Sequence, residues 1–193
     1  MYFYLGFAKM DEIILLEALM NLDPILKVLE INLDRIQHLV EDISEEQACW
    51  RPNRDSWSIL DVLVHLDFEE CEDFRARLKI TLRQDSDEQW PPIDPEAWVA
   101  EQRESECTRQ EALDGFVMER QDSLEWLNSV ISTQQAIDWD VEYMAPWGPM
   151  RAGDLLASWA GHDFLHMRQI VALQYAYTRD MAAPYQLKYA GDW

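Results

Sequence analysis

The sequence predicts an all-α fold, a four-helix bundle with long connections between its helices. Glycine is rare, with six in 193 residues, and 48% of the residues are hydrophobic. Nearly every apolar segment repeats at intervals of three and four residues, which is the period of an amphipathic helix. Valine and threonine are not gathered in the alternating runs that indicate strands. A chain of this length can form one compact domain with a sizeable core.

The first two expected helices have recognisable starts. Asp23 suits the N-cap of a helix whose narrow apolar seam continues to residue 43. Ser58 and Asp61 fit a capping box at the start of the second helix, which we expect to end near residue 82.

The other two helices follow long connections. Thr108 and Glu111 suggest a capping box before a third apolar face, and the last strong helix is expected at about 152–177. Residues 83–107 carry three prolines and many acidic side chains, so they should be broken and largely solvated, with a short helix from Pro95. A connection of this length can serve as a lid.

These elements divide the chain into an N-terminal extension (1–21), the bundle (22–178) and a C-terminal tail (179–193). Residues 133–150 form the second long connection within the bundle. The apolar run at 13–20, IILLEALM, either extends the N-terminal segment as a helix or covers a hydrophobic patch.

Charge and cysteine content exclude several classes of partner. Sixteen basic residues stand against 37 acidic ones, a net charge of −21, which repels phosphates and anionic lipids. We therefore expect neither a nucleic-acid nor a membrane partner. The three cysteines have no C-x-x-C spacing, and the N-terminus lacks the basic residue of a secretory signal, which predicts a reduced, cytoplasmic protein.

The histidines are the strongest indication of chemistry. His162 and His166 lie four residues apart on the last helix, within its apolar stripe, so both rings should point into the bundle. His65 lies at the edge of the core face of the second helix. His38 lies off the apolar seam of the first helix and should be exposed. Three facing imidazoles would bind a divalent transition metal and leave a position open. The pattern also fits core histidines bonded to carboxylates or carbonyls, or a proton-transfer pair.

These motifs resemble the DinB-like (DinB/YfiT) superfamily of bacterial metal-binding four-helix bundles. The resemblance rests on Trp57 and Ser58 with His65 seven residues after the serine, and on a C-terminal histidine pair followed by Gln169, here HDFLHMRQI. It spans about residues 22–178. It implies that His65, His162 and His166 hold nickel, zinc or a similar divalent ion. It also implies a relationship to transferases and isomerases that use a low-molecular-weight thiol such as bacillithiol or mycothiol.

Polar neighbours could support such a site. Asp61 and Glu69 flank His65 by four residues on each side, so either could orient the ring, add a ligand or act as a catalytic base, although Asp61 has a capping role and Glu69 could be an exposed helix carboxylate. With Asp163, HDFLH resembles the zincin motif H-E-x-x-H with a shorter acidic side chain. The Asp163 side chain is rotated about 100° around the helix from that of His162, which weakens a protease interpretation. Gln169 could hydrogen-bond close to the site or to backbone.

Three further residues are candidates for substrate binding. Trp147, in the PWGP turn, could line the apolar mouth of a pocket, or simply pack. Arg151 and Arg168 could bind a carboxylate of a substrate or thiol, although ion pairs with Asp154 or Asp163 are the alternative use.

Two classes of function follow. In the first, an enzyme, the metal lowers the pKa of a bound thiol or water, and the resulting thiolate or hydroxide attacks a small-molecule electrophile. Transfer of a thiol is preferred to hydrolysis only because the family resemblance implies it. In the second, a non-catalytic metal-binding or stress-response module, the metal stabilises the bundle or is sensed by it. Long helices and an apolar N-terminal segment also predict a homodimer.

Overall fold

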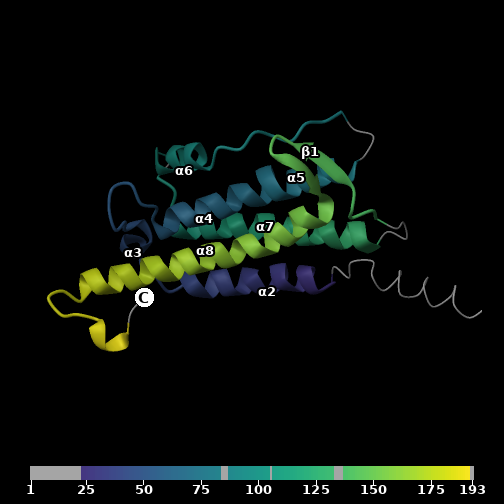
Figure 1. Ribbon diagram of the computed structural model, residues 1–193. Coiled ribbons are helices and arrows are strands. Elements are labelled where there is room, and N and C mark those ends of the chain that lie inside the picture. Colours follow the sequence, from purple (N-terminus) through teal and green to yellow (C-terminus); the bar gives the residue numbers. More distant parts are fainter. Residues whose placement is uncertain (1–22, 84–86, 105, 133–136, 192–193) are drawn as a thin grey trace, which may run out of the picture.

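The computed structural model describes residues 23–83, 87–104, 106–132 and 137–191, and its long helices lie side by side (Figure 1). The predicted N-terminal extension 1–21, with its run at 13–20, lies outside the described residues. The long helices are α2 (Asp23–Val40), α4 (Ile59–Phe68) continued by α5 (Arg75–Leu82), α7 (Arg109–Ser132) and α8 (Ala152–Met181). The short elements are α3 (Glu45–Cys49), α6 (Pro95–Glu104), β1 (Glu142–Ala145), β2 (Gly148–Arg151) and a 3-10 turn at Lys188–Ala190.

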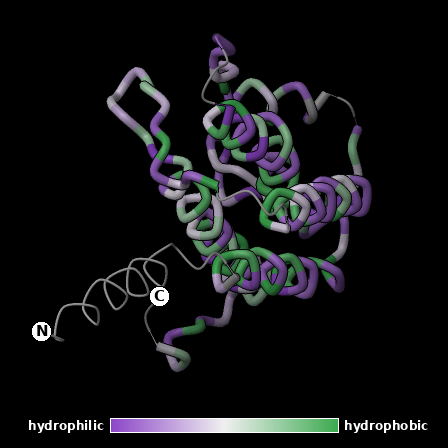
Figure 2. Tube along the Cα trace, turned by 90° about the vertical axis from the view of Figure 1, so that its right-hand side faces the viewer, coloured by the Kyte–Doolittle hydropathy of each residue, from purple (hydrophilic) through white to green (hydrophobic). Residues whose placement is uncertain are grey.

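The long helices confirm the predicted four-helix bundle. Helix α2 packs against α8 and α7, and α4 packs against the same two helices from the opposite side. Seen nearly along their axes, the helices surround a common interior, and hydrophobic and hydrophilic residues alternate along each tube (Figure 2). None of the described helices combines the length and the apolar character needed to cross a bilayer. Helix α8 continues to Met181, past the bundle boundary predicted at residue 178.

The directions of the helices explain the long connections. Helices α2 and α8 run one way, and α4–α5 and α7 run the other way (Figure 1). Because α5 and α7 belong to successive long helices that run in the same direction, the chain between them has to return along the bundle. Helix α6 forms on this return and packs against α4, with Val99 1% exposed and Trp98 stacked on Phe68. The short helix predicted from Pro95 is therefore confirmed, and it packs through Trp98 and Val99 while most of its other described residues stay exposed.

The connection at 133–150 contains a β-hairpin that the helical interpretation missed. Strands β1 and β2 are antiparallel, with Glu142 opposite Arg151, and Gly148 at the turn has a φ of +128°. Each strand has four residues, too few for an alternating pattern to stand out from the sequence. Tyr143 of β1 stacks on Trp90 with ring centroids 4.3 Å apart, which fixes the hairpin over the segment that follows α5.

Capping and a local π-helix determine which side chains of the second long helix face inward. Ser58 and Asp61 form the predicted capping box at the start of α4. Between α4 and α5, residues Glu69–Phe74 form a π-helical segment, whose wider turn shifts the phase of the helix. Glu69, Glu70 and Asp73 are consequently buried, at 5%, 2% and 6% exposure.

A buried arginine on α7 connects four helical segments. Arg120 donates from Nε to Oε1 of Glu70 (2.7 Å), from Nη2 to Oδ1 of Asp163 on α8 (2.8 Å) and from Nη1 to the carbonyl of Leu29 on α2 (3.1 Å). Asn32 of α2 donates to the same Asp163 carboxylate at 3.1 Å. Burial alone would lower the pKa of Arg120, but Glu70 and Asp163 raise it above its ordinary value, so this side chain remains a cation.

Replacing this cation should destabilise the fold severely. In Arg120→Met, two buried carboxylates lose their charged partner, so we expect the free energy of unfolding to fall by roughly 3–5 kcal/mol. Urea unfolding followed by circular dichroism measures the loss. Arg54→Met, at an exposed loop position, is the matched control and should change stability by less than about 0.5 kcal/mol. A loss below about 1 kcal/mol in Arg120→Met would contradict this role.

Candidate metal centre

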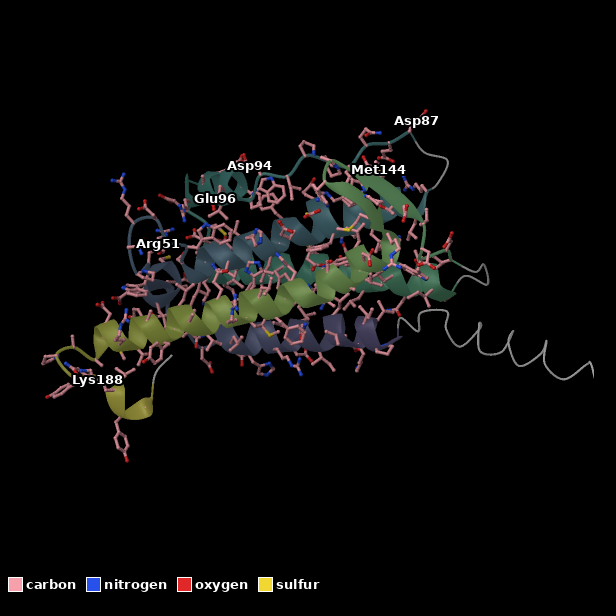
Figure 3. The ribbon with its side chains drawn as sticks, viewed as in Figure 1. Arg51, Asp87, Asp94, Glu96, Met144 and Lys188 are labelled. Carbon is pink, nitrogen blue, oxygen red and sulfur yellow. The ribbon has the colours of Figure 1, made fainter. Side chains whose placement is uncertain are left out.

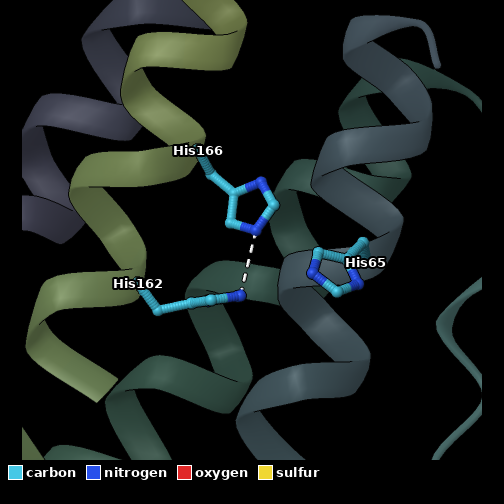
Figure 4. Close-up of side chains that lie close together, drawn as sticks. All are labelled: His65, His162 and His166. Atoms are coloured by element: carbon cyan, nitrogen blue, oxygen red, sulfur yellow. Dashed lines mark hydrogen bonds between the residues drawn. The ribbon is translucent and has the colours of Figure 1, made fainter. Parts of the chain in front are cut away.

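Three histidines from two helices converge on one point in the bundle. His65 on α4 faces His162 and His166 on α8, and one ring nitrogen from each lies within 4.8 Å of the other two (Figure 4). The ring centroids are 5.4 Å apart for His65 and His162, 4.7 Å for His65 and His166, and 4.3 Å for His162 and His166. These nitrogens form the group of possible metal ligands found among the described histidine, cysteine, aspartate and glutamate residues. They could hold a metal ion.

The three rings are held in the neutral form that binds a metal. Burial, reinforced by His166, lowers the pKa of His65 to about 3. Burial and the same neighbour lower the pKa of His162 to about 3, and burial lowers the pKa of His166. Metal coordination requires imidazole nitrogens without a proton, so the environment matches the chemistry of the ligand set.

Hydrogen bonding also fits a cation between the rings. The Nδ1–H of His166 donates to Oε1 of Gln169 (2.9 Å), which leaves the lone pair of Nε2 directed at His162, 3.0 Å from its Nε2. The Nδ1 of His65 is buried and has no hydrogen-bond partner among the described residues. A buried polar atom without a partner costs free energy, and a bound ion would remove that cost if this nitrogen were the ligand.

Aromatic rings close the sides of the cluster. Trp57 lies edge-on to His65 at 5.0 Å between centroids, and Phe74 lies edge-on to His162 at 5.2 Å. Trp159 stacks on Phe74, with an angle of 6° between the ring planes. These walls are apolar, so they limit access of water to the imidazoles.

Glu69 lies beside the cluster, and it is buried rather than on an exposed helix face. Its Oε1 is 3.7 Å from Nδ1 of His65, which is too long for a hydrogen bond. Burial and the neighbouring Asp73 raise the pKa of Glu69, and burial lowers the pKa of His65, so both shifts disfavour an ion pair between these side chains. The catalytic role predicted for Glu69 stays a prediction.

Asp61, the other predicted catalytic carboxylate, is occupied elsewhere. It accepts the backbone N–H of Ser58 at 2.7 Å and both Arg51 and Arg103 on its two oxygens. Arg51 and the α6 residue Glu96 lie at the same end of the molecule (Figure 3). The contacts of Asp61 support its capping role and occupy both carboxylate oxygens, so neither oxygen is free for catalysis. Asp61 joins the start of α4 to the preceding loop and to α6.

Asp163 and Gln169, predicted to support the histidines, differ in what they contact. Gln169 bonds His166 as described above. Asp163 makes no hydrogen bond to either neighbouring histidine, because its carboxylate faces Arg120 and Asn32. The alternative pairing of Asp163 with Arg168 is therefore wrong.

The predicted substrate-binding residues lie apart from the histidine contacts. Arg151 pairs with Asp154 (2.8 Å), as the alternative interpretation held, and with Asp140 (3.3 Å). Trp147 is 66% exposed on the hairpin, 6.2 Å from Trp90 between ring centroids. Arg168 lines a groove between α8 and α2. Their roles in binding substrate stay predictions.

Sequence reasoning missed the polar residues behind the cluster. Arg120 follows Phe116 by four residues and precedes Ser123 and Leu127 on one buried stripe, so an inward arginine was visible in the helical spacing. Glu70 accepts the indole N–H of Trp159 at 2.7 Å as well as Arg120. No periodic signal marks Glu70, because the π-helical segment breaks the period.

Comparison with known proteins agrees with the fold. A model of the DinB superfamily matches residues 29–170, which confirms the resemblance found in the sequence. One similar solved structure is YfiT from Bacillus subtilis, described as a probable metal-dependent hydrolase with an unusual four-helix bundle topology. It is 17% identical, with a TM-score of 0.67, and the match covers 81% of this chain and 87% of that one. No curated protein matches the sequence at a significant level.

The contacts of Asp61 predict acid-dependent stability. Burial alone would raise its pKa, but hydrogen bonds from Arg103 and Arg51 lower it from 3.8 to about 2. The folded state therefore gains stability from this group above about pH 4 and loses it as the pH falls towards 2. Because both arginines are partly solvated, Asp61→Asn should cost about 1–2 kcal/mol at pH 7.

Urea unfolding at several pH values tests this expectation. The difference between Asp61→Asn and the natural protein should shrink between pH 4 and the lowest pH at which both fold. Asp87→Asn, an exposed substitution, serves as the control. A difference that stays constant over that range would show that the charge of Asp61 contributes little.

Proposed function

We propose that this chain, which belongs to the DinB superfamily, is a metal-dependent enzyme that activates a small nucleophile through His65, His162 and His166. The convergence of three neutral imidazoles carries the proposal. A divalent transition metal such as nickel or zinc, when bound by these residues, supplies a Lewis acid that lowers the pKa of a thiol or water ligand.

The described part of the chain provides no fourth ligand in this group, which favours catalysis over a purely structural site. Among the described residues, the group within mutual reach contains three histidines and no carboxylate or thiol. Structural zinc sites are closed by four protein ligands, whereas catalytic sites keep one position for substrate or water. A non-catalytic metal-binding or stress-response module is the alternative that a fourth ligand would favour.

The surrounding side chains have defined tasks in this proposal. Gln169 fixes the tautomer of His166 through Nδ1, so that Nε2 is available to a ligand. Trp57 and Phe74 hold His65 and His162 from the side with apolar rings.

We propose a low-molecular-weight thiol as the nucleophile, because the family resemblance implies it. In the reaction, the thiol loses its proton to solvent, its sulfur forms a bond to the electrophilic carbon, and the leaving group departs with the bonding electron pair. The second candidate is hydrolysis, in which water replaces the thiol. The description of YfiT as a probable metal-dependent hydrolase favours this candidate.

Metal retention tests the ligand assignment. Protein purified without added metal should contain about one divalent ion per chain by elemental analysis, and His65→Ala, His162→Ala and His166→Ala should each lose most of it. At about 100 times Kd, a bound ion stabilises the fold by roughly 2.7 kcal/mol. Each variant should lose this difference in stability between metal-loaded and chelator-treated samples, measured by thermal melting.

The matched control is His38→Ala, because His38 is exposed, with 74% of its side chain accessible. It should retain both the metal and the metal-dependent stabilisation. Comparing loaded with chelated samples of the same variant removes the packing cost of deleting a buried ring. Equal metal content in all four variants would show that the three rings are core histidines.

Activity distinguishes the two reactions and the non-catalytic alternative. With cysteine and monochlorobimane as probes, metal-loaded protein should accelerate thioether formation with release of chloride, and the three histidine variants should lose at least about 100-fold in rate. Faster hydrolysis of p-nitrophenyl acetate without thiol transfer would favour the hydrolase. Retained metal with neither reaction, over a panel of thiols and electrophiles, would favour the binding module.

A further inference from the structure

An apolar groove with a volume of about 690 Å³ runs between α2 and α8. Its floor is formed by Ile31 and Leu39 of α2 and by Met167 and Val171 of α8. The groove lies on the side of α8 that meets α2, whereas His166 faces His65 on α4. It is therefore separate from the candidate metal centre, and nothing in the proposed reaction uses it.

The apolar surface extends beyond the groove along α8. Phe164 and Leu165 are 48% and 54% exposed, and Phe164 lies four residues before Arg168, on the same face as the groove. Contiguous apolar surface of this kind mostly marks a contact site. The chain as a whole carries a net charge of −21, so the charged side chains around the groove decide which occupant can bind there.

The local charge of the groove is basic. Arg35 lines it from α2 and Arg168 from α8, with the carboxylate of Asp34 as the opposing charge. One arginine on each helix gives a local excess of positive charge on a strongly acidic protein. The groove therefore favours an apolar occupant that carries acidic residues.

The residues that precede α2 have this composition. Within residues 1–22, the run at 13–20 is IILLEALM and the start, MYFYLGF, is aromatic, while the charges are three acidic residues against one lysine, a net of −2. We propose that residues 1–20, the N-terminal segment, dock in the groove between α2 and α8 of their own chain.

The length of the segment suffices for this docking. From Asp23 to Leu39, α2 rises about 24 Å at 1.5 Å per residue, and twenty residues span about 30 Å even as a helix. A segment attached at the end of α2 also has an effective concentration on the order of millimolar at a groove that begins two turns away. A second copy lacks this advantage, and its own charge of −21 opposes association.

Cysteine labelling in the full-length protein tests the proposal. Cys49, Cys71 and Cys107 are replaced by serine, and Val171→Cys provides a probe in the groove. Its reaction rate with a maleimide should rise at least about fivefold when Leu15→Asp and Leu16→Asp are introduced together. Arg168→Glu, an exposed charge reversal, should raise the rate at least about twofold without any change in the segment.

A control probe and the protein concentration identify the occupant. Gln121→Cys, exposed on α7, should label at the same rate in every background. Protection of Val171→Cys should not depend on protein concentration. Protection that grows with concentration, together with a dimer in light scattering, would overturn the proposal in favour of a second copy.

Two other outcomes would also overturn it. Rapid labelling of Val171→Cys with the natural segment would show an open groove. Slow labelling that persists with both aspartates in the segment would show that something else covers the groove.

Discussion

The ion-pair network around Arg120 is the constraint on which the rest of the structure depends. A buried guanidinium has to satisfy its donors, and here it does so with Glu70, Asp163 and a carbonyl of α2, so all four long helices of the bundle are held in one relative position. Buried ion pairs give little net stability compared with apolar contacts, but they tolerate few alternative arrangements. The network therefore fixes how α8 sits against α4, and that relation determines whether His162 and His166 reach His65.

The π-helical segment Glu69–Phe74 makes the network compatible with the site. One wider turn carries Glu70 to Arg120 while Phe74 contacts His162 and stacks on Trp159. In a regular α-helix these inward positions would be spaced differently, and the carboxylates and the aromatic wall would not share one face. Local geometry of the backbone, rather than composition, thus decides which acidic residues of EECEDF are buried.

The sequence predicted the parts that depend on periodicity and capping. The long helices, the capping box of Ser58 and Asp61 and the exposure of His38 follow from spacing along single helices. Spacing also placed His162 and His166 on one inward face, whereas their grouping with His65 as a ligand set came from the family resemblance. Sequence reasoning failed where long-range contacts decide. The hairpin depends on Tyr143 stacking on Trp90, and the orientation of Asp163 depends on an arginine 43 residues earlier.

The parallel arrangement of α2 and α8 has a consequence for synthesis. Asn32 and Asp163, which bond across this pair, are separated by 131 residues, and two of the three histidines lie on α8. During translation the emerging chain can form the α4–α7 contact first, because both helices precede α8. The histidine cluster is complete only after α8 has been synthesised, so before that a nascent chain holds only His65 of the three.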